Sequence, residues 1–170
     1  MSKIRRADGR QLFEIEKERF PITVDYGMPL YEMWNMARKS IRWLGSIELR
    51  GITFSHTAGI HKFDCYYAVL LEDDCHLWRM DEDFQECNIV PADMRQFFAF
   101  CPANIRTEVT REKPAPIVAA ASGSTWRCSH DCLHEMVGVH WDSCYHAPGP
   151  SLGMESAPFK KGTRFLAICQ

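Results

Sequence analysis

The sequence lacks long apolar segments and any strong net charge. No apolar run in its 170 residues approaches the roughly 20 residues that a membrane-spanning helix needs. Residues 2–10 are mostly polar, and no apolar segment typical of a secretory signal follows them. The formal net charge is only −2, so no global field would gather nucleic acid or an anionic membrane. We therefore expect a cytoplasmic protein that binds neither a membrane nor nucleic acid.

The patterns of several common enzyme sites are also missing. His134-Glu135 resembles the start of a zinc-protease helix, but Gly138 stands where the second histidine should be. Gly123 belongs to no glycine-rich phosphate loop, which gives a nucleotide site no support. The sequence therefore favours a protein that is not an enzyme.

What the sequence does contain fits one folded domain. Hydrophobic residues make up 46% of the chain, which is enough for a substantial core at this length. There is no internal repeat and no long Pro, Gly or Ser linker. Lysine and arginine gather near the N-terminus, so we expect residues 1–11 to form a basic flexible arm and residues 12–170 to form a single α+β domain.

Hydrophobic periodicity predicts two main helices. Residues 29–44 carry apolar side chains at helical spacing, and a second helix is expected between Pro91 and Pro102. Alternating or β-branched segments predict strands at 13–16, 20–24, 63–71, 116–121 and 163–169. Pro21 places one of them near a sheet edge. Together these elements predict an antiparallel or mixed sheet and a β-rich C-terminal half.

Polar and turn-forming residues predict where the chain lacks regular structure. The composition indicates an exposed polar segment at 108–114 and a loop at 146–153. We also expect residues 76–80 to continue the strand before them, with one or two helical turns after that.

Cysteine and histidine concentrate in one late segment, and the candidate metal ligands there are Cys128, His130, Cys132, His134, His140, Cys144 and His146. The first four recur every second residue, so a strand would place them on one side. Thiolate and imidazole are ligands that zinc prefers. Alternate residues of a strand lie about 7 Å apart, however, so four could not reach one ion without a bend. A zinc-stabilised domain is therefore one alternative, and cysteines that act as reduced, buried hydrophobes are the other.

A cysteine nucleophile is a further alternative for the same segment. It needs a base beside the thiol and a group that orients the base. The residues available for these roles are Cys128 or Cys132, then His130, His134 or His140, then Asp131 or Asp142. No nucleophile-elbow or oxyanion-loop motif accompanies them, so the hydrolase is the weaker hypothesis.

Two features could contact a protein partner. Trp126 and Trp141 flank the Cys/His segment, and aromatic residues are enriched at binding hot spots. An acidic strip could face a basic partner, and its candidate contact residues are Asp73, Asp74, Asp81, Glu82 and Asp83. One hypothesis is that this strip mimics nucleic acid toward a host nucleic-acid-binding protein.

Four segments follow one another in an order found elsewhere. They are ITVDYG with YEM at 22–33, VPADMRQFFAF at 90–100, PIVAAASGSTW at 116–126 and RFLAI at 164–168. With these segments the chain resembles a loose set of small uncharacterised phage and bacterial proteins. The resemblance implies one domain, a phage or prophage accessory origin, and hence the host cytosol. It implies no activity, and it includes no fixed Cys/His cluster, so a metal site would be a local addition.

The leading prediction is a non-enzymatic phage-type accessory protein that binds a host or viral protein and needs no cofactor. It is favoured mainly because the enzyme patterns fail. The alternatives are the zinc-stabilised domain and the cysteine-dependent hydrolase.

Overall fold

The structure is a computed structural model, and it describes residues 2–5, 9–41, 58–73, 75, 77–119, 126–127, 133–134, 137–150 and 158–169. The helices are α1 (Leu30–Ala37), α2 (Leu77–Glu86) and α3 (Met94–Glu108). The strands are β1 (Ser2–Arg5), β2 (Gln11–Ile15), β3 (Phe20–Asp25), β4 (Ile60–Leu70), β5 (Val90–Pro91), β6 (Ile117–Ala119), β7 (Trp126–Arg127), β8 (Leu133–His134), β9 (Val137–Asp142), β10 (Ala147–Pro150) and β11 (Arg164–Ile168). The α+β class is confirmed, and α2 is a third helix beyond the two that were expected.

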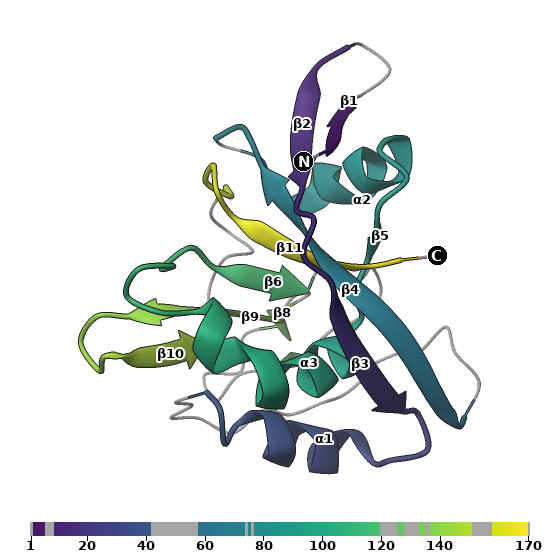
Figure 1. Cartoon of the computed structure of the whole chain (residues 1–170), viewed down its shortest axis with the longest axis vertical. Coiled ribbons are helices and arrows are strands. Elements are labelled where there is room, and N and C mark those ends of the chain that lie inside the picture. The colour runs from purple at the N-terminus through teal and green to yellow at the C-terminus, as the bar shows by residue number, and fades with distance from the viewer. Residues whose placement is uncertain are drawn as a thin grey trace.

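Most of the described strands belong to one mixed sheet (Figure 1), whose main path runs β1-β2-β4-β11-β6-β9-β10. β3 pairs with β4 beyond the end of β2, and β5 pairs with β11. β6 and β11 run parallel, while the other pairings in this sheet are antiparallel. A small β7-β8 pair stands apart. Within the described residues, every element after α3 is a strand, which confirms the β-rich C-terminal half.

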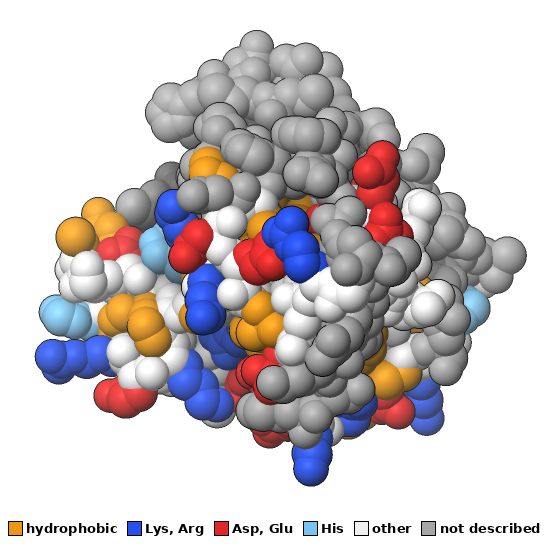
Figure 2. Space-filling view, turned by 90° about the horizontal axis from the view of Figure 1, so that it is seen from above, with side chains coloured by type: hydrophobic (Ala, Val, Ile, Leu, Met, Phe, Trp, Pro, Cys, Tyr) orange, Lys and Arg blue, Asp and Glu red, His pale blue; other side chains and the backbone are white. Residues whose placement is uncertain are grey.

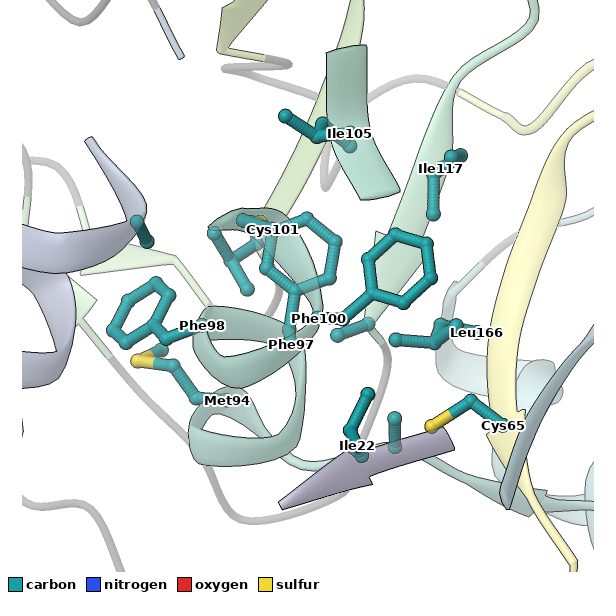
Figure 3. Close-up of a cluster of buried hydrophobic side chains, with 14 of the residues drawn as sticks. Ile22, Cys65, Met94, Phe97, Phe98, Phe100, Cys101, Ile105, Ile117 and Leu166 are labelled. Atoms are coloured by element: carbon teal, nitrogen blue, oxygen red, sulfur yellow. The ribbon is translucent and has the colours of Figure 1, made fainter. Parts of the chain in front are cut away.

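The centre of the sheet is buried on both faces, because alternate residues of a strand point to opposite sides. On β4, Cys65 and Tyr67 face the core beneath α1 and α3, while Tyr66 and Ala68 face the core beneath α2. Figure 3 shows Phe97 and Phe100 of α3 directed toward the sheet in the first of these cores. The layers are therefore α1 and α3, then the sheet, then α2 (Figure 1).

The first helix and the sheet edge follow the sequence patterns. α1 begins after Pro29, a position where the missing N–H of proline costs nothing. Its buried face carries Met33, Trp34 and Ala37, three of the residues at helical spacing. Pro21 lies in β3, which pairs with β4 on one side, so its placement near an edge is confirmed.

Several segments differ from their sequence patterns. Ser2–Arg5 pairs antiparallel with β2 as strand β1, where a flexible arm was expected. Residues 77–80 begin α2 rather than continue a strand. Ala147–Pro150 forms β10 where a loop was expected. β10 ends the path of the sheet, and an edge is where a strand tolerates prolines.

The second main helix is longer than expected. α3 starts at Met94 with Asp93 as its N-cap and continues through Pro102 to Glu108. Glu108 is buried, so the exposed polar segment begins later than residue 108. Pro102 cannot donate a hydrogen bond to the carbonyl of Phe98, four residues earlier, which leaves that carbonyl without its usual helical partner.

Candidate functional site

The strongest candidate site lies beside β3, whose outer edge has no strand partner in the part of the chain that the structure describes. The Tyr26 N–H donates to the Gly59 carbonyl at 2.8 Å. This bond shows which backbone groups of β3 point toward β4 and which point away from it. Because the backbone groups of a strand alternate in direction, those of the even-numbered residues face β4. Those of Pro21, Thr23 and Asp25 therefore face outward.

Local bonds fix how the chain leaves this edge. The Asp25 carboxylate accepts a hydrogen bond from the Gly27 N–H at 2.8 Å, and the Asp25 carbonyl accepts one from the Met28 N–H at 3.1 Å. An aspartate that bonds the backbone two residues ahead forms a compact turn. The turn directs the chain from β3 into α1.

A buried tyrosine joins β3 to α3. Tyr26 Oη donates to Asp93 Oδ2 at 2.8 Å. Asp93 also accepts from the Gln96 N–H at 2.7 Å, and Gln96 Oε1 accepts from the Asp93 N–H at 2.8 Å, which completes a capping box. Burial, and next the Asp93 carboxylate, raise the pKa of Tyr26, so the phenol stays protonated and keeps its role as donor.

A second bond holds the turn against α3. The Arg95 guanidinium donates from Nη1 to the Met28 carbonyl. The same nitrogen lies 3.4 Å from the sulfur of Met33. The end of β3, the start of α1 and the start of α3 are thus held in one arrangement.

β3, α1 and α3, together with the first residue of β4, line a surface groove of about 200 Å³. We call it the methionine groove, and its lining residues are Thr23, Asp25, Met28, Met33, Met36, Ile60, Phe98, Ala99 and Pro102. Phe98 and Met33 are buried, whereas Met36 is 48% exposed and Ile60 is 70% exposed. In Figure 3, Phe98 points from α3 toward α1, and its ring centroid lies 5.5 Å from that of Trp34. The groove therefore has a fixed inner wall and an exposed apolar rim.

The lining is suited to binding apolar side chains. Methionine is unbranched and polarizable, so it adapts to varied partners. Of the described residues that line the groove, Asp25 alone is ionisable. The sequence analysis missed this site because it depends on Met36 and Ile60, which are far apart in the chain. A signal was present in Met36, which lies outside the apolar stripe of α1.

A buried ion pair lies at the other end of α3. Arg164 Nη1 lies 3.6 Å from Glu108 Oε2, and Arg164 Nη2 donates to the carbonyls of Glu108 and Ala115 at 2.7 and 2.8 Å. The Arg164 guanidinium also covers the Tyr67 ring at 5.1 Å. Because these contacts join α3 to β11 in the interior, we interpret the pair as structural.

Of the predicted metal ligands, Cys128, His130 and Cys132 lie outside the described residues, as does Asp131. His134 lies in β8 opposite Trp126, and His140 lies in β9. Cys144 and His146 lie in the turn between β9 and β10. Within the described ranges, no three His, Cys, Asp or Glu side chains are grouped to hold a metal. The zinc-stabilised domain stays a prediction.

Two of the described thiols, Cys65 and Cys101, are poorly suited to act as nucleophiles. Burial raises the pKa of Cys65 to about 12 and also raises that of Cys101. A thiol with a raised pKa forms little of the reactive thiolate near neutral pH. Asp142 accepts hydrogen bonds from the Cys144 and Tyr145 N–H groups, so it is engaged in the turn. Cys128 and Cys132, the proposed nucleophiles, lie outside the described residues, and the hydrolase stays a prediction.

The described residues of the acidic strip differ in how far they are exposed. Asp73 is exposed and accepts from the Lys161 N–H at 2.9 Å, and Asp74 lies outside the described residues. Asp81 and Glu82 are exposed on α2, but Asp83 is only 4% exposed. Figure 2 shows acidic and basic side chains interspersed on the face seen from above. Asp83 is thus buried where an exposed residue was expected, and contact of the other strip residues with a partner stays a prediction.

The two tryptophans differ in what the structure describes. Trp141 is half-buried on β9 and packs against the core beneath α1 and α3. For Trp126 the backbone is described, in β7. Contact of either with a partner stays a prediction. No helix among the described residues is long and apolar enough to cross a membrane.

Comparison with known proteins gives no match. No family model, no curated protein and no solved structure matches this chain.

Proposed function

We propose that this protein acts by binding a protein partner, and that the methionine groove is the surface that the partner occupies. The observation that carries the proposal is the apolar rim, where Met36 and Ile60 stay exposed beside a hollow of about 200 Å³. Clustered exposed apolar surface is typical of interaction sites. A partner that covered this rim would remove from water the apolar side chains that now face it.

The lining supports binding more than catalysis. Asp25 is the one ionisable residue among the described lining residues, and its carboxylate already accepts a hydrogen bond from Gly27. A nucleophile with an adjacent base, which catalysis of acyl transfer needs, is not formed by these side chains. The accessory role in a phage or prophage, and the cytoplasmic location, enter the proposal through the resemblance of the sequence segments.

The proposal is tested by capture from a bacterial lysate with matched variants. We expect Met36→Glu and Ile60→Glu to lose a protein that the wild type retains, because each places a charge on the apolar rim. Tyr31→Glu is the control, since Tyr31 is 61% exposed on the same helix and lies outside the groove lining.

The retained protein is identified by mass spectrometry, and each variant is checked for folding by circular dichroism. Equal retention of the partner by the wild type and both groove variants would overturn the proposal. So would a turnover assay that succeeds with Met36→Glu while no partner is found.

A further inference from the structure

The outer edge of β3, which has no strand partner among the described residues, suggests how a partner would bind. We propose that the partner enters the methionine groove as an extended segment that adds a strand to the outer edge of β3. Its aliphatic side chains would face the methionines, and a basic side chain would lie beside Asp25. This inference rests on the proposed function, because it describes how the same groove is occupied.

The backbone of the edge offers a defined set of bonds. Thr23 presents an N–H and a carbonyl, Asp25 presents an N–H, and Pro21 presents a carbonyl. The Asp25 carbonyl is already used by the Met28 N–H, and Pro21 has no N–H to leave unpaired. A strand laid along this edge would therefore make four hydrogen bonds without meeting a mismatched group. The spacing of about 7 Å between alternate residues is that of any extended chain.

The shape of the groove favours one strand over a broader surface. The groove is lined by Thr23 and Asp25 of β3, by Met36 of α1, and by Ala99 and Pro102 of α3. A space lined by both the edge strand and two helices admits a single extended chain more readily than the edge of a second sheet. Addition of a peptide strand at an exposed edge, with alternate side chains in pockets, is a recurring mode of recognition.

The lining indicates which side chains the segment carries. Alternate residues of an added strand would point toward Met33 and Phe98, which form the buried inner wall. Aliphatic side chains fit such a wall because burial removes them from water. Asp25 contributes the charge among the described lining residues, so a lysine or arginine in the segment is complementary to it.

The test begins with short random peptides displayed on phage and selected on the immobilised wild-type protein. We expect enrichment of alternating aliphatic sequences that contain a basic residue. The most enriched peptide is synthesised with a fluorophore, and its dissociation constant is measured by fluorescence polarisation. Asp25→Asn keeps a side-chain acceptor for Gly27 but removes the charge, and should weaken binding by about two- to fivefold. Unchanged affinity of Asp25→Asn would overturn the inference that the bound segment carries a basic residue beside Asp25.

A matched pair of variants tests the backbone pairing. Thr23→Pro removes the outward N–H, as Pro21 already does on the same edge, and leaves the bonds to β4 in place. Thr23→Val removes the hydroxyl but keeps the N–H. We expect Thr23→Pro to weaken binding by at least about tenfold, and Thr23→Val to change it by less than about twofold. Equal affinity of folded Thr23→Pro and the wild type would overturn added-strand binding.

N-methylation of the peptide gives a second readout that does not depend on folding of a variant. Methyl groups on alternate peptide nitrogens should weaken binding by about tenfold or more, and those between them should not. If methyl groups at neighbouring nitrogens weakened binding equally, the inference of an added strand would be overturned.

Two outcomes separate the inference from the proposed function. If no peptide is enriched but the lysate partner is still lost from Met36→Glu, the extended segment is wrong and the proposed function stands. If neither peptide binding nor a lysate partner is found, both the inference and the proposed function are wrong. Light scattering that shows a wild-type dimer converted to a monomer by Thr23→Pro would also overturn the inference, because a second copy would then occupy the edge.

Discussion

The two faces of the sheet both carry packed aromatic rings, but they differ in what the described residues leave open. Beneath α2, aromatic rings meet one another, with centroid distances of 5.4 Å for Phe13–Phe84, 5.3 Å for Phe84–Phe165 and 5.0 Å for Phe159–Phe165. Beneath α1 and α3, the core ends at the methionine groove, whose rim is exposed. Among the described residues, the α2 face is packed with aromatic rings, and the α1–α3 face opens beside the outer edge of β3.

This difference separates stability from recognition. Rings held at such distances give a close-packed region that resists any change of volume. In the proposed function, the flexible methionines beside the outer edge of β3, which has no strand partner among the described residues, adapt to another chain at little cost to the fold. We expect substitutions on the α2 face to act on the free energy of unfolding, and those at the groove to act on binding.

The largest effect should come from the aromatic cluster. Phe165→Ala would leave a cavity among Phe13, Phe84 and Phe159, and should lower the free energy of unfolding by about 3–5 kcal/mol. Urea unfolding followed by circular dichroism measures this change. Ile60→Ala is the control, because Ile60 is exposed at the rim of the methionine groove and lies outside the aromatic cluster. A loss below about 1 kcal/mol for Phe165→Ala would show that the α2 face is not rigid.

The buried ion pair should give the next largest effect. Arg164→Met would leave the Glu108 carboxylate buried without its guanidinium partner, since both residues are only 6% exposed. We expect a loss of about 3 kcal/mol in the free energy of unfolding. Lys113→Met is the control, because Lys113 reaches Glu108 at 3.4 Å from an exposed position, and such exposed pairs contribute about 0–1 kcal/mol. Equal losses for the two variants would contradict the structural role of Arg164.

A smaller effect is expected for a substitution that should change both stability and partner binding. Tyr26→Phe removes the hydrogen bond to Asp93 that joins β3 to α3, and should cost about 1 kcal/mol of stability. Because this bond holds the two walls of the groove together, partner binding should weaken as well. Tyr31→Phe, at an exposed position on α1, should change neither quantity. Unchanged binding by Tyr26→Phe would mean that the walls do not depend on this bond.

The strands and α1 could be predicted because their patterns are local. β3 alternates buried and exposed residues over Phe20–Asp25, and β11 is a short apolar run, so periodicity was sufficient for both. The C-terminal end of α3 could not be predicted from local patterns. Pro102 normally ends a helix, but the apolar residues on both sides of it pack into one core, and this packing outweighs the local preference.

The groove could not be predicted because it joins segments that only the fold brings together. Asp25 and Ile60 lie opposite each other in the pairing of β3 with β4, and Pro102 joins them in the groove lining through the packing of α3. The Cys/His segment presented the stronger pattern in the sequence, since its residues are neighbours in the chain. Dense local patterns draw attention to single segments, whereas a surface hollow depends on long-range contacts.

The smallest effect should appear in the pH dependence of stability, at the end of the α1–α3 face far from the groove. Burial raises the pKa of Glu16 above its ordinary value of 4.5, and the nearby Arg164 charge only partly offsets this. A carboxyl group whose pKa is higher in the folded state favours folding when it is protonated. Its contribution is therefore complete below pH 4.5 and is lost as the pH rises through the raised value.

Glu16→Gln keeps a neutral side chain at every pH, so the variant should match the wild type in acid and exceed it slightly near pH 7. Solvent screens this half-buried group, which limits the gain to less than about 0.5 kcal/mol. Urea unfolding of both proteins across the acidic range measures the difference, and Glu18→Gln serves as the exposed control. A Glu16→Gln protein that is less stable than the wild type near pH 7 would mean that attraction to Arg164 outweighs burial at this site. The face that carries the groove would then hold a favourable ion pair at its far end rather than a strained carboxylate.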